Sequence, residues 1–500
     1  MQGFSPRGKH RLHDRCLPQA DEELIPLVIS HVMDLATLPA DVSLSAYAGG
    51  PRSTAQARRN RTHYDTTIVT SLIVTTWYHA PGGGPIMRVE ESHDVGRLWL
   101  GQGLTGAGTQ VATLALPLTA ILLLHASAGV VGMLTALQWV PFLGLSLFVG
   151  IVVDRRRRQP LLILGNLVRA AALGGIVSLA YTGHLSVSLL LALVFVLGCG
   201  AVVFEVALPA YVPGLVGTGD LIGVNQRLQS AATGAQLGGP VAAGLLVQVL
   251  SAPLALGLNA LGFVGSAWAF GTIRHAEVAP PRSGTRPWLE LREGVRFTWS
   301  HRHLRSLIPV SASYNLFNQW LLTVYVIYAV RDLHLSPFLI GVTLAGGTVG
   351  AFLGAKASDA LSQRFGLGAS FLSVVIVECG AALLVPFVPR QSPWELPLLL
   401  GAFGLMDFGA TLSGVIAMAV RQTVTPSALL GRMTAFYRTV SYGTIPLGAA
   451  AGGWVAEWLG LWPSLFIGAA LLLTTIAWAA SSPLTGVRST LELPAPPSSS

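Results

Sequence analysis

The chain has 500 residues, of which 52% are apolar and only 11% are charged, and its mean hydropathy is +0.60. Soluble domains carry about a quarter charged residues, so this composition favours an integral membrane protein and argues against a string of soluble domains. The formal net charge of +8 does not indicate nucleic-acid binding, because the basic residues lie in short gaps between apolar runs and set membrane topology there.

Residues 1–92 are a predicted extension outside the membrane. The stretch is rich in Arg, His, Pro and Gly, and its apolar windows are too short or too interrupted to span a bilayer. It lacks the pattern of a signal peptide. Met87 directly precedes a short polar stretch of the kind that comes before a first span. We interpret residues 1–86 either as the result of a start codon assigned too far upstream or as a genuine disordered or regulatory extension.

Apolar windows long enough to cross a bilayer as helices recur from Leu98 onward. The gaps between them are mostly short, so neighbouring helices are expected to run antiparallel. The predicted spans are 98–124, 129–153, 160–181, 185–213, 221–249, 253–273, 305–330, 337–359, 367–388, 395–420, 427–458 and 460–481. They predict an all-α integral membrane fold of twelve transmembrane helices in two pseudo-symmetric six-helix halves.

The two predicted halves cover residues 93–273 and 305–482, and a disordered tail follows at 483–500. Between them, the linker 274–304 carries three prolines and then an amphipathic stretch, 288–299. This pattern is typical of a helix that lies on the membrane surface.

Four consecutive arginines, Arg155–Arg158, lie between the second and third predicted spans. Such a run cannot lie in hydrocarbon, and the positive-inside rule places it in the cytoplasm. Alternating the spans from this loop puts both termini and the linker on the cytoplasmic side. We therefore expect a multi-pass protein of the inner (plasma) membrane.

The halves share short matches at an offset of 204 to 209 residues. Residues 127–132 match 336–341, residues 150–154 match 354–359, and the segments around Gly223 and Pro240 match those around Gly431 and Pro446. Their common order predicts a duplicated unit, with chance similarity between Gly-rich helices as the alternative. Transporters built from such repeats bind substrate where the halves meet and alternate access by rocking.

Several motifs carry a resemblance to a known family. They are Gly150-x-x-x-Asp154-Arg155-x-x-Arg158, Pro209-Ala-Tyr-Val-Pro213, Gly239-Pro240, Leu291-Arg-Glu-Gly294 and Gly431-Arg432 with Tyr437-Arg438. Over Leu98 to about Pro483 the chain resembles major facilitator superfamily transporters. More narrowly, it resembles the branch of enterobactin exporters and macrolide-efflux proteins. The motifs do not indicate which molecule is transported.

The resemblance implies gating roles for residues of three motifs. In the family the loop of the first motif holds the halves together in the outward-open state, and a Gly-Pro motif lies where the halves meet. The expected gating residues are Gly150, Asp154, Arg155, Arg158, Gly239, Pro240, Gly431 and Arg432. In the second copy Ser358 replaces the acid unless Asp359 serves instead, so the arrangement is expected to be asymmetric. The alternatives are a simple topology signal and ordinary small-residue packing.

Acids inside spans are costly and usually functional. The candidates are Glu205, Asp407 and Glu378, in the fourth, tenth and ninth spans. In the family the first, fourth, seventh and tenth spans line the cavity, which favours Glu205 and Asp407 over Glu378. Each favoured acid is a candidate proton carrier or counter-charge for a cationic substrate. For Glu205 the alternative is a structural pairing with Arg169.

Four amides are further candidates for the substrate cavity: Gln110, Asn315, Asn318 and Gln319. Amide and aromatic linings suit bulky amphipathic molecules, and hydrogen bonding between helices is the alternative. Many relatives carry an acid in the first span, where this chain has Thr109 and Gln110. This departure argues against proton coupling through that span.

These observations predict a secondary active exporter of small amphipathic molecules, such as drugs, natural products or siderophores, driven by proton antiport through alternating access. The sequence has no P-loop motif, which argues against ATP as the energy source. It also has no catalytic or metal-ligand constellation of the kind expected in an enzyme. We expect a small-molecule substrate, a proton and the lipid bilayer as partners, with no nucleic acid and no cofactor, and a monomer. The alternatives are an importer or facilitator of the same fold and a non-transporting membrane sensor.

Overall fold

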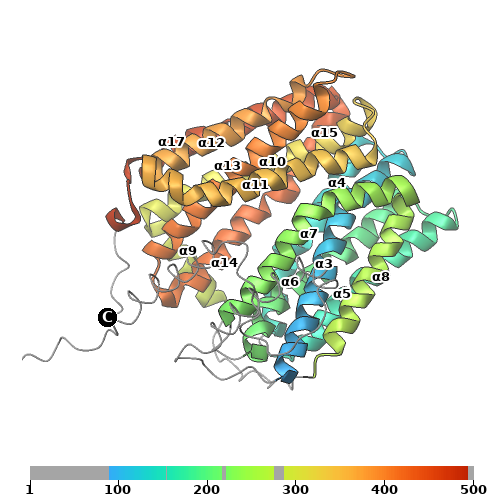
Figure 1. Ribbon diagram of the computed structural model, residues 1–500, viewed down its shortest axis with the longest axis horizontal. Coiled ribbons are helices and arrows are strands. Elements are labelled where there is room, and N and C mark those ends of the chain that lie inside the picture. Colours follow the sequence, from blue (N-terminus) through green and yellow to red (C-terminus); the bar gives the residue numbers. More distant parts are fainter. Residues whose placement is uncertain (1–88, 154, 217–220, 275–286, 494–500) are drawn as a thin grey trace, which may run out of the picture. The chain divides into compact units, whose positions relative to one another are not determined.

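The computed structural model describes residues 89–153, 155–216, 221–274 and 287–493, which belong to one unit, Ile86–Ser500. Within these ranges all regular structure is helical, as the hydropathy pattern predicts (Figure 1). Nearly all of the predicted extension 1–92 lies outside the described residues, and so does Asp154.

Helices occupy every predicted span, most of them within a few residues of the predicted bounds. The first half contains α3 (Val89–Leu122), α4 (Ala128–Val153), α5 (Arg158–Tyr181), α6 (Val187–Val216), α7 (Leu221–Leu250) and α8 (Ala252–Gly271). The linker contains α9 (Pro287–Ser300), which coincides with the amphipathic stretch. The second half contains α10 (Arg302–Arg331), α11 (Pro337–Phe365), α12 (Leu367–Ala382), α13 (Glu395–Val424), α14 (Ser427–Gly443), α15 (Ile445–Leu459), α16 (Leu461–Leu472) and α17 (Thr474–Ala480), with short 3-10 turns at Val385–Phe387, Pro483–Gly486 and Thr490–Glu492.

Nine spans among the described helices are long and apolar enough to cross a membrane, or ten if the two parts of the bent α7 count as one. The two predicted spans outside this set are α10 and the α14–α15 pair. The structure therefore shows a multi-span helical protein, while the full number of twelve spans stays a prediction.

Proline interrupts one helix in each half. Helix α7 bends by 41° between Gln236 and Gly238. Because Pro240 has no N–H, it cannot bond to the carbonyl of Gln236 four residues earlier. Thr348 Oγ1 of α11 donates to that carbonyl instead, at 3.2 Å. In the second half Pro446 lies just after the break between α14 and α15.

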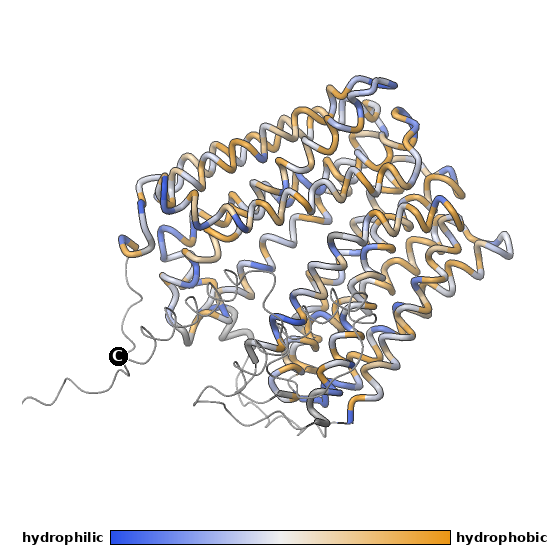
Figure 2. Tube along the Cα trace, viewed as in Figure 1, coloured by the Kyte–Doolittle hydropathy of each residue, from blue (hydrophilic) through white to orange (hydrophobic). Residues whose placement is uncertain are grey.

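The surface of the helices is apolar along much of its length. Figure 2 shows hydrophilic residues concentrated at helix ends and loops, with apolar residues along the helices between them. Large side chains such as Trp268 and Trp458 are 68% and 85% exposed. Soluble proteins rarely expose large apolar patches. In a membrane protein such side chains contact lipid.

Glycines let helix backbones touch inside each half. In the first half Gly165 of α5 and Gly200 of α6 lie against each other's carbonyl groups. In the second half Gly350 of α11 lies against the backbone of Gly404 of α13. Small residues of this kind support helix association in membranes, where lipid removes most of the hydrophobic driving force.

We expect Gly350→Leu to destabilise the protein by about 1–3 kcal/mol, because a side chain there overlaps the Gly404 backbone. Gly401→Leu in α13 is the matched control, since a Cβ at Gly401 meets no atom within 4 Å. Thermal unfolding of both variants in detergent measures the difference. Equal stability of the two variants would contradict the close contact of α11 and α13.

Candidate functional site

The two halves meet at the end of the helices where the loop between α3 and α4 lies, here called the Ser127 end. Glu457 of α15 accepts hydrogen bonds from the Ser127 hydroxyl and the Gly129 N–H, both at 2.7 Å. Arg331, the last residue of α10, donates to the carbonyl of Ala126 at 2.6 Å. Two charged side chains of the second half thus hold one loop of the first half.

A second contact at the Ser127 end joins α7 to α11. Gly244 lies against the backbone of Pro337 and Phe338, and Gly341 lies against the carbonyl of Pro240. The side-chain carbonyl of Gln248 accepts from the N–H of Phe338 at 3.2 Å. Pro240 therefore lies between the halves, as the resemblance implies.

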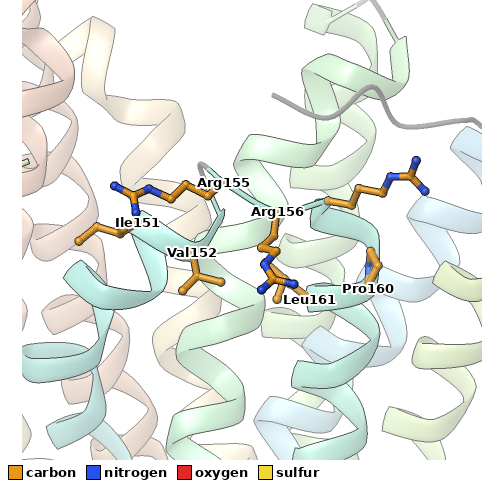
Figure 3. A pocket seen from close by; sticks show the side chains of 7 residues that line it. Ile151, Val152, Arg155, Arg156, Pro160 and Leu161 are labelled. Atoms are coloured by element: carbon orange, nitrogen blue, oxygen red, sulfur yellow. The ribbon is translucent and has the colours of Figure 1, made fainter. Parts of the chain in front are cut away.

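The other end of the helices, here called the Arg155 end, contains the turn between α4 and α5. A cavity of about 570 Å³ lies at this turn, lined by Ile151, Val152, Arg155, Arg156, Arg157, Pro160 and Leu161. Figure 3 shows Arg156 extending alongside Leu161 and Arg155 extending past Ile151. Gly150 lies in the last turns of α4 and Arg158 begins α5. Since Asp154 is outside the described residues, its gating role stays a prediction.

Arg432, a predicted gating residue at the start of α14, forms an ion pair with Glu293 of the linker helix α9. Gly294 lies against the backbone of Arg432, so α9 and α14 touch there. A Cβ at the neighbouring Gly431 would meet no atom within 4 Å. In this arrangement Arg432 attaches the linker to the second half.

The first half contains a buried cation that the sequence indicated only as a pairing partner. Arg169 of α5 is 3% exposed, donates to Thr109 Oγ1 at 2.6 Å and lies 3.9 Å from the centre of the Phe263 ring. Glu205 of α6 is exposed and is the acid whose charge acts on Arg169. Thr109, one of the two residues that the resemblance sets at the place of an acid in the first span, therefore contacts a cation.

A neighbouring polar cluster joins three helices of the first half. Asn166 of α5 donates to Thr105 of α3 at 3.1 Å and to Ser266 of α8 at 2.8 Å, and Thr105 and Ser266 bond to each other at 2.7 Å. All three residues are buried. Sequence reasoning missed Asn166 and Ser266, because isolated small polar residues in an apolar helix leave no pattern.

The second half contains a cavity of about 300 Å³ between α10, α12, α13 and α14. Glu378 of α12, 2% exposed, lines this cavity and accepts from Ser413 at 3.2 Å. Arg421 lies with its guanidinium 4.1 Å from the centre of the Tyr437 ring. The cavity lining also includes Leu307, Val310, Ser311, Tyr314, Asn315, Phe371, Ala410, Gly414, Ala417, Arg438, Ser441 and Tyr442. An acid that helix numbering set aside is thus the one that lines this cavity.

The remaining predicted residues are spread over both halves. Asp407 of α13 lies against Gly347 of α11 and is not among the residues that line the cavity. Asn315 lines the cavity while bonding to Ser311 of its own helix at 2.8 Å. The other three amides have separate surroundings: Gln319 donates to Thr323 of its own helix at 3.2 Å, Asn318 is half-buried in α10, and Gln110 of α3 lies against Gly239 of α7.

Comparison with known proteins shows the family to which the chain belongs. Residues 92–495 match the family described as transmembrane secretion effectors. The chain belongs to this family. It is therefore a multi-pass membrane transporter of the efflux branch of the major facilitator superfamily, as its motifs predicted.

Two multidrug efflux pumps are similar to most of the chain. The multidrug efflux pump Tap of Mycolicibacterium fortuitum is 25% identical over 369 residues, 71% of this chain and 87% of that protein. Tap of Mycobacterium tuberculosis H37Rv is 24% identical over 371 residues, 72% of this chain and 86% of that protein.

Two transporter structures show a similar fold. The nucleoside transporter NupG has a TM-score of 0.64 at 11% identity and covers 78% of this chain and 98% of its own. A bacterial homologue of the iron transporter ferroportin, in an inward-facing state, has a TM-score of 0.61 at 18% identity, with 79% and 98% covered.

The junction between α9 and α10 contains two histidines that precede the predicted span 305–330. Burial, together with the neighbouring Arg302 charge, lowers the pKa of both His301 and His303. The native junction therefore favours neutral imidazoles. Its stability is fully present above the histidine pKa of an unfolded chain, about 6.5, and is lost as the pH falls below that value.

We expect hydrogen exchange in α9 to speed up between about pH 7 and pH 5. His301→Gln with His303→Gln should remove this pH dependence, because glutamine does not titrate. Hydrogen–deuterium exchange of peptides covering 287–303, corrected for the intrinsic rate at each pH, measures it. A pH dependence that is unchanged in the double variant would place the titrating group elsewhere.

Proposed function

We propose that the protein is a proton-coupled exporter of small amphipathic molecules that works by alternating access. Membership of the efflux branch supports export, and the relatives named multidrug efflux pumps support a drug-like substrate. The observation that carries the coupling proposal is the pair of acids, Glu378 and Asp407, inside helices of the second half.

The proposed topology has twelve spans. It adds α10 and the α14–α15 pair to the helices that are long and apolar enough to cross a membrane. Helix α10 has 30 residues, and an α-helix of that length extends about 45 Å, more than the hydrocarbon core needs. The Arg155 end then faces the cytoplasm, as do both termini, in the inner membrane. Residues 93–273 and 305–482 form the two halves, and the transporter is a monomer.

In this orientation the hydrogen bonds at the Ser127 end close the protein towards the outside. Rocking the halves apart at this end would break the bonds of Glu457 and Gln248 and open an outward path. The turn at Arg155, with Asp154, would then hold the halves together on the cytoplasmic side, as the family resemblance implies. With the Ser127 end closed, substrate enters from the cytoplasm.

The cavity of the second half offers both charge and aromatic surface to a substrate. Arg421 supplies a cation next to Tyr437, and Glu378 supplies a buried carboxyl group. Tyr314 and Phe371 add aromatic faces. Such a lining suits amphipathic molecules that combine rings with polar groups.

The surroundings of Asp407 change when α11 and α13 move relative to each other. It lies where α13 touches α11 at Gly347, and no hydrogen bond or ion pair joins it to another of the described residues. A carboxyl group inside a span is costly to keep charged, so it can take up and release a proton as its access to water changes. Glu205 has Arg169 as a neighbouring charge, which leaves a structural pairing as the alternative role for that acid.

We expect Asp407→Asn and Glu378→Gln each to slow proton-driven export about tenfold, the effect of about 1.4 kcal/mol on the coupled step. Glu395→Gln is the matched control, because Glu395 is also buried but begins α13 at a loop and accepts from the Gln391 N–H at 2.8 Å. Glu205→Gln tests the first half. Uptake of a fluorescent amphipathic dye into inverted vesicles, with and without a proton gradient, measures export.

The same assay separates the alternatives. Dye flux in the opposite direction would indicate an importer, and flux that ignores the gradient would indicate a facilitator. Full export in an Asp407→Asn, Glu378→Gln and Glu205→Gln triple variant would rule out these acids as proton carriers. If neither the wild type nor any variant moves a panel of compounds, a membrane sensor becomes the better description.

A further inference from the structure

The two contacts that join the halves at the Ser127 end are related by the internal repeat. Positions 127 and 336 are serines 209 residues apart, and each caps the helix that follows it. Ser127 Oγ accepts from the Val130 N–H and Ser336 Oγ accepts from the Leu339 N–H, both at 3.4 Å. The helices α4 and α11 therefore begin in the same way.

The backbone contacts repeat at the same offset. Gly132 of α4 lies against Gly453 and the Ala449 carbonyl of α15. At positions 209 residues away, Gly341 of α11 lies against Gly244 and the Pro240 carbonyl of α7. The contacts α4–α15 and α7–α11 are therefore equivalent, each built on two glycines and one carbonyl.

The side chains that complete these contacts differ in one respect. The N–H of Gly129 bonds to Glu457, and the N–H of Phe338, at the equivalent position, bonds to Gln248. Positions 248 and 457 are again 209 residues apart. One contact is thus completed by an amide and the other by a carboxyl group, which also accepts from Ser127.

We propose that Glu457 is a proton-binding site that controls the opening of the Ser127 end. As a carboxylate it accepts two hydrogen bonds at the N-terminus of α4, where the helix dipole also favours negative charge. Protonation removes that charge and weakens the contact. The α7–α11 contact has an amide at the equivalent position, so its hydrogen bond does not depend on the charge of a carboxyl group. That this end faces outward rests on the proposed function.

The side chain of Glu457 is exposed near the end of α15. A proton can therefore reach it without separation of the halves. The charged and titratable groups of the segments that meet at this contact include His125 on the α3–α4 loop and Arg331, which donates to Ala126 of that loop; Asp332, which follows Arg331, pairs with Arg390. Since a carboxylate can accept both hydrogen bonds of the closed end, we expect protonation of Glu457 to favour the open form.

The test compares full-length protein in lipid nanodiscs from about pH 7.5 to pH 4.5. Spin labels at His184 and Trp394, both exposed at the Ser127 end of opposite halves, report the distance between the halves by double electron–electron resonance. Cys16, Cys199 and Cys379 are replaced by alanine in every variant. We expect acid to raise the ratio of open to closed protein about threefold, the size of an exposed charge at a helix N-terminus.

Glu457→Gln is the decisive variant, because glutamine keeps the acceptor oxygen and copies the α7–α11 contact. It should reduce or abolish the pH dependence while leaving the closed form populated at neutral pH. Gln248→Glu should add a second pH-dependent contact and increase the response to acid. His125→Gln should leave the response unchanged. High salt should weaken the wild-type closed form more than that of Glu457→Gln.

Two results would overturn the inference: a pH response of wild-type size in Glu457→Gln, or a response that is lost in His125→Gln. Failure of the proposed export function is a separate outcome. If no dye is moved in vesicles but the distances still change with pH through Glu457, the gating inference stands and the export proposal is wrong.

Discussion

Direct contact between helix backbones at glycine is the constraint on which this structure depends. In lipid, helices gain little from hiding apolar surface from one another, so their association relies on close packing. Gly350 and Gly404 hold α11 to α13 inside the second half, and Gly132 and Gly453 hold α4 to α15 between the halves. Contacts of the first kind join helices within one half, and those of the second kind join the two halves, which rocking must separate.

The location of the helices could be predicted from the sequence because hydropathy and span length are properties of continuous segments. The amphipathic pattern of a continuous segment likewise predicts α9, and the match of residues 127–132 with 336–341 predicts the repeat of Ser127 at Ser336. The direction in which a single side chain points was harder to obtain. The order of helices in the family disfavours Glu378 because its helix is peripheral, yet Glu378 lines a cavity with Arg421. Helix numbering does not say which face of a helix carries a residue.

Isolated polar residues that join distant helices are also hard to predict from the sequence. Asn166 and Ser266 are isolated in apolar helices, and Glu457 is a lone acid near the end of a span. None of them belongs to a motif, and their importance appears only when helices distant in sequence are side by side. The repeat offset could have pointed to Glu457, because it aligns this acid with Gln248 and thus exposes a difference between equivalent positions.

The bond between Thr348 and the carbonyl of Gln236 has a consequence for water in the membrane. Pro240 permanently deprives that carbonyl of a partner within its own helix, and an unpaired carbonyl in hydrocarbon costs several kcal/mol. When α11 moves away, another donor must replace Thr348, and water that enters between the halves can do so. The kink of α7 therefore favours hydration at this carbonyl whenever the halves separate.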